Sequence, residues 1–203
     1  GGQGVQRATE SKAASMPLAE AVREPSFMIL NAAFFMLGLT ATGLVLQQVP
    51  LLVDAGWTAA DATFHVQFVF GFALLFARVC VGFVIDHIFA PRVMMTVSIG
   101  GAVACLLYAL YPDAAIVSAI LLGFLLGAEF DVLAFLIRRY YGNIAYGRIY
   151  GVIFAVFYLG SGLGIWALPK LREVSADQSY DNGLYVAAVI LAVIGWLVGR
   201  RSY

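Results

Sequence analysis

Three ionisable residues lie inside long apolar stretches of this sequence: Arg78, Glu129 and Asp131. An ionisable group near the centre of a bilayer costs at least ~2.5–3.5 kcal/mol and needs a partner or a wet cavity. A guanidinium in such a setting binds anions, and a carboxyl group can carry a proton. The pattern therefore indicates either an anion site beside a proton carrier or a structural ion pair that fixes how two helices pack.

The three groups share one depth if both stretches are helical. Arg78 lies eight residues before Asp86, or ~12 Å deep, while Glu129 and Asp131 lie nine and seven residues before Arg138, or ~13.5 and ~10.5 Å deep. Residues two apart on a helix point about 200° apart. We therefore expect one carboxyl group to face Arg78, and the other to find water, a polar group or a proton.

The elements that hold these residues are six apolar stretches of roughly 20 residues each, long enough to cross the ~30 Å core of a membrane. Hydrophobic residues make up 62% of the chain and charged residues 12%, which excludes a water-soluble globular domain. The stretches cover residues 27–53, 64–85, 91–111, 114–137, 144–168 and 184–199. Breakers separate them, among them Pro112 after the third stretch and Pro169 closing the fifth. The sequence predicts an all-α membrane protein with one domain over 27–199, between segments 1–26 and 200–203.

Charge predicts the topology of these helices. If residues 1–26 lie on one side, all of the twelve Lys and Arg residues except Lys170 and Arg172 fall on that side. Basic residues favour the cytoplasmic side, so we expect both termini in the cytoplasm. Four tyrosines near the same boundary fit an interfacial aromatic belt: Tyr140, Tyr141, Tyr146 and Tyr150.

Close-spaced glycines are a second feature of the apolar stretches. Such pairs allow a neighbouring helix to approach closely. Gly162 is a third glycine between the pair Gly160 and Gly164 of the fifth stretch. The outer half of that helix therefore has few bulky side chains, which would allow either tight packing or bending. The pairs are Gly123/Gly127, Gly147/Gly151, Gly160/Gly164 and Gly195/Gly199.

A third feature is the stripe formed by Arg78, Gly82 and Asp86, which recur every four residues and drift only ~40° per step. Gly82 would let another helix come close. Asp86 ends the stripe at the membrane surface, where it can accept hydrogen bonds from a helix N-terminus or pair with a cytoplasmic arginine such as Arg92. We expect these residues to form a latch that need not survive every conformation.

The stripe and the segment after it, His87-Ile-Phe-Ala-Pro-Arg92, resemble the cytoplasmic loop between the eighth and ninth helices of major facilitator superfamily transporters. Residues 18–27 are similar to the lead-in to that family's seventh helix. Residues 127–131, 138–142 and 146–151 resemble its tenth and eleventh helices in bacterial members near the monocarboxylate and oxalate/formate branch. His87 stands where the superfamily commonly has arginine, which leaves a weaker, pH-dependent charge beside Asp86.

The resemblance implies the C-terminal six-helix half of a twelve-helix secondary transporter, with residues 1–26 as a remnant of the central linker. In that family two halves rock about a central site, and each half holds a three-plus-three inverted repeat. Arg78 matches an arginine that contacts the substrate carboxylate in monocarboxylate carriers. Asn31, Thr40 and Gln47 of the first helix are then expected to line the path. The implied function is transport of a small organic anion by alternating access, coupled to protons or to exchange, in a bacterial inner membrane.

Two other classes of function compete with transport. Six helices supply half of the usual cavity wall, so the chain could instead be a membrane interaction module that needs a partner half or a second copy. An enzyme is disfavoured because His65 and His87 lie at opposite ends of one helix, and Cys80 and Cys105 sit in apolar helices without a ligand pattern. We expect no metal, no cofactor and no nucleic-acid partner, and membrane lipid and a small anion as ligands.

Overall fold

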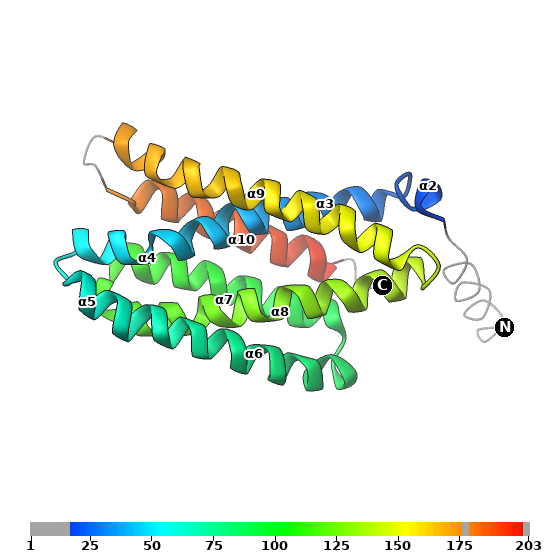
Figure 1. Cartoon of the computed structure of the whole chain (residues 1–203), viewed down its shortest axis with the longest axis horizontal. Coiled ribbons are helices and arrows are strands. Elements are labelled where there is room, and N and C mark those ends of the chain that lie inside the picture. The colour runs from blue at the N-terminus through cyan, green and yellow to red at the C-terminus, as the bar shows by residue number, and fades with distance from the viewer. Residues whose placement is uncertain (1–16, 176–178, 201–203) are drawn as a thin grey trace.

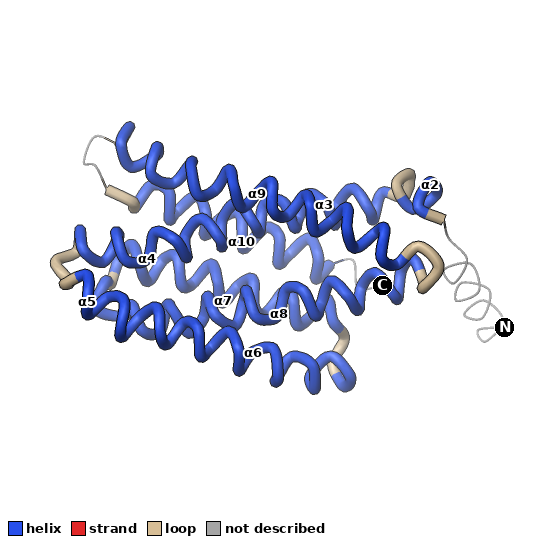
Figure 2. The backbone as a smooth tube through the Cα atoms, viewed as in Figure 1, coloured by secondary structure: helices blue, strands red, loops and turns tan. Residues whose placement is uncertain are grey.

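The computed structural model describes residues 17–175 and 179–200, and the side chains of Asp86, His87 and Arg200 lie outside that description. The described chain is almost entirely helical (Figures 1 and 2). Six of its helices are long and apolar enough to cross a membrane, which confirms the predicted all-α fold. They are Pro25–Asp54, Ala59–Ile85, Ala90–Leu110, Pro112–Tyr141, Tyr146–Val174 and Asp181–Gly199.

Several spans are built from more than one helical element. A short helix, α2 (Leu18–Ala21), precedes the first span, which consists of α3 (Pro25–Leu37), the π-helical turn η1 (Gly38–Thr42) and α4 (Gly43–Asp54). The second span consists of α5 (Ala59–Asp61), the π-helical η2 (Ala62–Gln67) and α6 (Phe68–His87). The remaining elements are α7 (Ala90–Leu110), the short 3₁₀ helix η3 (Pro112–Ala114), α8 (Ala115–Tyr141), α9 (Tyr146–Val174) and α10 (Asp181–Arg200).

Successive spans run antiparallel and form a bundle with two ends (Figure 1). We call proximal the end where α3 begins, which also holds the α6–α7 and α8–α9 turns, and distal the end where α4 meets α5. Arg92, Arg138 and Arg148 belong to the proximal end, whereas Lys170 and Arg172 belong to the distal end. For these residues the helix order agrees with the predicted grouping of charge.

The helices pack in a pattern that repeats with inversion. The first span packs along α9, and α6 packs along α8, while α7 packs against both α8 and α10. In an inverted repeat, the first, second and third spans correspond to the fourth, fifth and sixth. Under this correspondence the packed pair of spans one and five becomes the packed pair of spans four and two, and the pair of spans three and six maps onto itself. This pattern is the contact signature of a three-plus-three inverted repeat.

Glycines of α9 allow the first span to lie against it at backbone distance. A Cβ on Gly160 would overlap the carbonyl oxygen of Phe35, and one on Gly164 would overlap that of Leu39. The first span contributes Gly38, where a Cβ would overlap the carbonyl oxygen of Phe157. Membrane helices that associate through such small residues gain dispersion contacts that larger side chains would prevent.

Two helix boundaries differ from the sequence prediction for identifiable reasons. The second span begins at Ala59, five residues before the predicted start at residue 64, because Thr58 Oγ1 accepts a hydrogen bond of 3.1 Å from the Asp61 amide and caps the helix. Pro169 does not close the fifth helix as predicted: it lies inside α9, which continues to Val174. Proline at this position removes one helical hydrogen bond, the one that residue 169 would donate to the Ile165 carbonyl, but the helix continues past it. The added residues carry Arg172 into contact with the first span.

The surface of the second span that faces away from the bundle carries a row of large apolar side chains, which begins in η2 and continues along α6. Phe64, Phe72 and Phe83 are 69%, 63% and 71% exposed. Rings exposed to this degree along one face are stable in hydrocarbon and not in water. The row therefore marks the lipid-facing side of the second span.

Candidate functional site

Close packing of α6 on α8 brings the intramembrane ionisable residues together. A Cβ on Gly127 of α8 would lie 2.6 Å from the carbonyl oxygen of Leu74 and 2.7 Å from the Cβ of Ala77. Gly123, one turn earlier, meets the same helix at Ala73 and Phe70. Arg78 therefore directly follows the point where the two backbones are nearest.

The Arg78 guanidinium lies beside the 129–131 segment of α8, the region that the depth argument predicted. Its Cζ atom is 6.0 Å from the centre of the Phe130 ring, and it interacts electrostatically with both Glu129 and Asp131. The side chain is exposed, and in the part of the chain that the structure describes no ion pair within 4.0 Å joins it to a carboxylate. Because the Arg78 guanidinium lies near two carboxyl groups without forming an ion pair with either, it can bind an anionic ligand.

Glu129 and Asp131 occupy different environments because they point about 200° apart. Asp131 is one helical turn after Gly127, so it is on the face of α8 that packs against α6, and it is half-buried. Glu129 points into the bundle, where it is 1% exposed, and its Oε2 atom has no hydrogen-bond partner among the described residues. Asp131 is thus the carboxyl group on the side of Arg78, and Glu129 is the carboxyl group in the interior of the bundle.

Aromatic rings extend this cluster onto α9. Phe130 lies 5.2 Å, centre to centre, from both Phe154 and Phe157, so it bridges Arg78 to the fifth span. Sequence reasoning assigned Tyr146 and Tyr150 to an interfacial belt and missed the continuation of their four-residue spacing into the membrane. The i, i+4 spacing was the available signal.

The three polar residues predicted on the first span have hydrogen-bond partners other than Arg78, and for Asn31 and Thr40 those partners lie in the same span. Asn31 Nδ2 donates to the Phe27 carbonyl oxygen at 2.9 Å, and Thr40 Oγ1 donates to that of Met36 at 2.8 Å. Gln47 Oε1 accepts a hydrogen bond from the Tyr180 hydroxyl at 3.0 Å. Among the described residues, no hydrogen bond joins any of the three to Arg78.

The buried polar atoms of the first span are an unexpected feature. Gln48 is fully buried, and within the described chain neither atom of its amide group has a hydrogen-bond partner. Asn31 Oδ1 is also buried without one. Thr42 accepts a hydrogen bond of 3.2 Å from Ser161 of α9, which ties the π-helical turn η1 to the fifth span.

The residues predicted to form a latch are only partly described. Gly82 has nothing within 4 Å of the position a Cβ would take, so no helix in the described part of the chain approaches it. Arg92 is exposed on the first turn of α7, and the side chain of Asp86 lies outside the described residues. The latch stays a prediction.

The predicted glycine pairs fall into two groups. Gly123, Gly127, Gly160 and Gly164 lie where neighbouring helices meet, and Gly195 and Gly199 lie against Met95 of α7. Gly147 and Gly151 differ, because a Cβ on either would meet nothing within 4 Å. No helix of the described chain packs on them, so they leave an edge of α9 bare at its proximal half.

A polar cluster at the distal end was not predicted. Arg172 Nη2 lies 2.7 Å from Asp54 Oδ2, which joins the end of α9 to the end of α4. The Arg172 guanidinium also lies 5.2 Å from the centre of the Tyr180 ring, whose hydroxyl donates to Gln47. Burial raises the pKa of Tyr180, so this hydroxyl keeps its proton at neutral pH and remains a donor.

We expect the Asp54–Arg172 pair to contribute modestly to stability. The two side chains are 41% and 37% exposed, and ion pairs of this kind contribute about 0.2–1 kcal/mol. Asp54→Asn should lower the Tm of the purified protein by at most a few degrees at low salt, and by less at 0.5 M NaCl. Glu173→Gln is the matched control, because the Lys170–Glu173 pair lies within one helix. A loss of more than 10 °C would show that the distal cluster is a major determinant of the fold.

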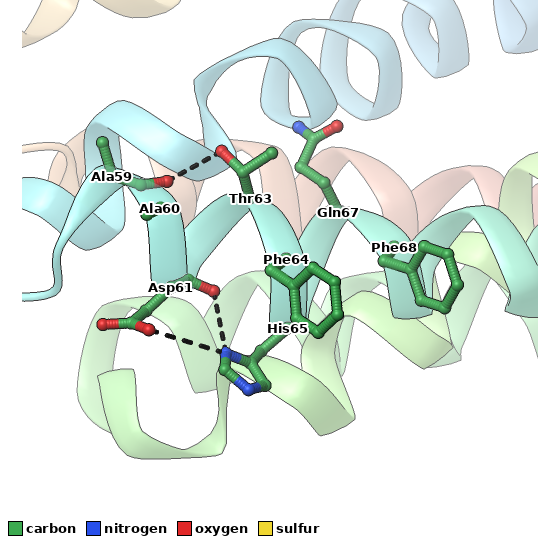
Figure 3. Close-up of a pocket in the computed structure, with 8 residues that line it drawn as sticks. All are labelled: Ala59, Ala60, Asp61, Thr63, Phe64, His65, Gln67 and Phe68. Atoms are coloured by element: carbon green, nitrogen blue, oxygen red, sulfur yellow. Dashed lines mark hydrogen bonds and ion pairs between the residues drawn. The ribbon is translucent and has the colours of Figure 1, made fainter.

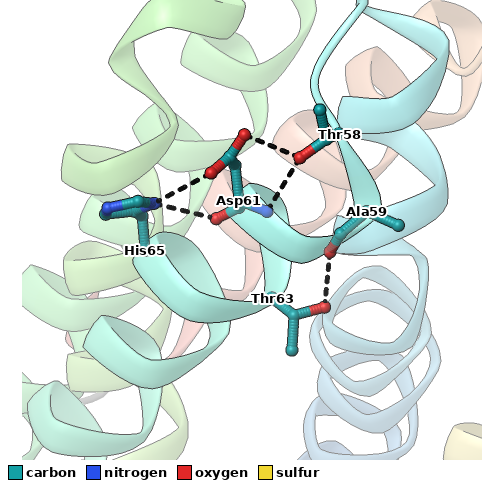
Figure 4. A network of polar contacts seen from close by, with 5 residues as sticks. All are labelled: Thr58, Ala59, Asp61, Thr63 and His65. Atoms are coloured by element: carbon teal, nitrogen blue, oxygen red, sulfur yellow. Dashed lines mark hydrogen bonds and ion pairs between the residues drawn. The ribbon is translucent and has the colours of Figure 1, made fainter.

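The hollow at the distal start of the second span is far from Arg78. Its wall is formed by side chains of α5, η2 and the first residue of α6 (Figure 3). His65 Nδ1 lies 3.2 Å from the Asp61 carbonyl oxygen and 4.0 Å from Asp61 Oδ1, while Thr58 donates to Asp61 Oδ2 at 2.6 Å (Figure 4). Arg78 is thirteen residues further along, or ~20 Å at helical rise. The contacts of Thr58 and Asp61 form a helix cap, and in the described residues no three His, Cys, Asp or Glu side chains are grouped as a metal site would require.

The inverted packing and the intramembrane charges together indicate a transporter fold, and comparison with known families agrees. The sequence model of the Major Facilitator Superfamily matches residues 3–165, most of the chain. The chain belongs to this superfamily. It is accordingly a multi-pass membrane protein of a transporter family, and its six spans form half of a major facilitator fold. A search of curated proteins found no match.

Proposed function

We propose that this chain is the C-terminal six-helix half of a secondary active transporter that moves a small organic anion, such as a monocarboxylate, by alternating access. The observation that carries the proposal is Arg78, an exposed guanidinium roughly 12 Å from the membrane surface that no carboxylate within 4.0 Å neutralises among the described residues. A carboxylate can accept two parallel hydrogen bonds from such a group. Asp131 and Glu129, which interact with Arg78, would release it in exchange for the substrate.

Glu129 is the proposed proton carrier. A buried carboxylate with no partner is costly to hold in the membrane interior, and loading a proton removes the charge. Its Oε2 atom has no partner in this conformation, so a change of conformation that brings water to it would let it exchange a proton. Asp131, half-buried on the α6 side, then serves as the electrostatic partner of Arg78.

The alternative assignment is a half-transporter or interaction module that needs a partner half or a second copy. The exposed edges of α6 and α9 favour a partner there, because Gly82, Gly147 and Gly151 meet no helix among the residues that the structure describes. In either case the proposed location is a bacterial inner membrane, with the proximal end and both termini in the cytoplasm. The basic residues Arg92, Arg138 and Arg148 at the proximal end support that orientation.

The test is uptake of radiolabelled small carboxylates into proteoliposomes, with and without an imposed pH gradient. The 203-residue chain is compared with a longer protein that carries an upstream six-helix half. Saturable uptake by the short chain would mean that two copies form a path, and uptake by the longer protein alone would mean that the chain is half a transporter. No uptake by a correctly folded longer protein would overturn the anion assignment.

Proton coupling predicts a specific effect of one substitution. If Glu129 carries the proton, Glu129→Gln should make uptake insensitive to an inward proton gradient, because the amide cannot titrate. Asp131→Asn is the matched control two residues away, and the gradient should still stimulate its residual uptake. Equal gradient dependence in wild type and Glu129→Gln would contradict the role of Glu129.

A further inference from the structure

Four aromatic side chains form a stripe along α9, one helical turn apart. Tyr146 and Tyr150 stack with ring centres 5.9 Å apart and planes at 29°, and Tyr150 and Phe154 stack at 5.7 Å and 23°. Tyr158 closes the series edge-on to Phe154 at 4.7 Å. Steps of four residues drift ~40° around a helix, so the stripe turns from the half-buried side at Tyr146 to the exposed side at Tyr158, which is 56% exposed. The rings run from the proximal boundary into the membrane.

Phe130 connects this stripe to the cation of the proposed anion site. Its ring lies 5.2 Å from that of Phe154 and 6.0 Å from Arg78 Cζ. Tyr150 stacks on Phe154, with ring centres 5.7 Å apart, and so belongs to the same aromatic cluster. A cation from α6, a ring from α8 and rings from α9 thus meet at one place.

The rings at this place are only partly covered. Phe130, Tyr150 and Phe154 are half-buried, in contrast to Phe157, which belongs to the core. Gly151, the residue after Tyr150, has nothing within 4 Å of a Cβ, and neither does Gly82, one turn beyond Arg78. The small residues leave the surface beside the guanidinium and the rings open to a ligand.

We infer that the anion bound at Arg78 is an aromatic monocarboxylate, whose carboxylate pairs with the guanidinium while its ring packs against Phe130 and Phe154. This inference rests on the proposed function and names the substrate class of the same site. A simple aliphatic acid of equal size would meet Arg78 equally well but would lack the quadrupolar attraction between rings. Aromatic pairs gain enough beyond area burial to favour an aromatic ligand by roughly 2- to 10-fold.

Equilibrium binding of radiolabelled benzoate to whichever form of the protein transports, the 203-residue chain or the longer protein, purified into lipid nanodiscs, tests this inference, with unlabelled acids as competitors. Benzoate and cyclohexanecarboxylate form the matched pair, because both present one carboxylate on a six-membered carbon ring and only benzoate is aromatic. We expect benzoate to compete roughly 2- to 10-fold better. Phe154→Leu should bring the two acids to within 2-fold of each other, and Phe154→Tyr should retain the preference.

Phe124→Leu is the control for a general packing effect. Phe124 pairs with Phe76 across the same two helices, α8 and α6, at 6.1 Å, but it has no ring contact with Phe130 or Phe154 among the described residues. This variant should keep the preference, and a loss equal to that in Phe154→Leu would overturn the inference. Equal competition by the two acids in wild type, with binding still lost in Arg78→Ala, would overturn it while leaving the anion site intact. Absence of any Arg78-dependent carboxylate binding would overturn the proposed function and the inference together.

Discussion

Replacing Arg78 by alanine should lower saturable carboxylate uptake by on the order of 100-fold. Removing one partner of a desolvated, hydrogen-bonded charge pair costs about 2–5 kcal/mol, which is the interaction that the substrate would lose. The comparison is made in proteoliposomes that contain whichever form of the protein transports, at matched protein density. Arg78→Lys should recover part of the uptake, because an ammonium keeps the charge but not the planar fork of donors.

The competing hypothesis makes Arg78 a structural partner of the α8 carboxylates. In that case a variant that neutralises both members of the pair, Arg78→Gln with Asp131→Asn, should restore uptake, since neither residue would be left charged without the other. A substrate-binding Arg78 predicts that the double variant stays inactive. Uptake by the double variant at near wild-type rate would refute the anion site.

The sequence predicted the juxtaposition of Arg78 with Glu129 and Asp131 because helical rise converts residue counts into depth. It also predicted that one carboxyl group would face away, since two residues span about 200°. The sequence could not assign which of Glu129 and Asp131 faces Arg78. The answer depends on the face of α8 that packs against α6, and the contact at Gly127 determines that face. The depth of a residue in the membrane follows from its own helix alone, whereas the direction in which its side chain faces depends on which neighbouring helix packs there.

Other features needed three-dimensional information for a similar reason. Asn31 and Thr40 are suitable types of residue for a binding site, yet each donates to a carbonyl of its own helix, an alternative that residue type alone cannot exclude. The link from α9 through Phe130 to Arg78 joins three helices, so no single stretch of sequence contains it. The cap by Thr58, in contrast, was a local signal that a search for Thr-x-x-Asp would have found.

Gly164 offers the largest expected effect on stability. Gly164→Ala places a methyl group where it would overlap the backbone carbonyl oxygen of Leu39, and a backbone atom cannot move aside as a flexible side chain can. The helices would have to separate along the contact that joins α9 to the first span. Overpacking of this kind costs about 1–3 kcal/mol, which corresponds to a Tm decrease of roughly 2–12 °C in a protein of this size. Thermal unfolding of the purified protein in detergent measures it.

Gly162 provides the matched control on the same helix, two residues away. A Cβ there meets nothing within 4 Å, so Gly162→Ala adds no clash. Alanine is the better helix former by about 1 kcal/mol, and the control should therefore leave the Tm unchanged or raise it. The opposite signs separate close packing from helix propensity, because both substitutions make the same chemical change in one helix. Equal shifts at the two positions would mean that the first span and α9 are not held at backbone distance. If Gly162→Ala preserves the Tm but slows uptake, bending of α9 at its glycine-rich distal half contributes to the transport cycle.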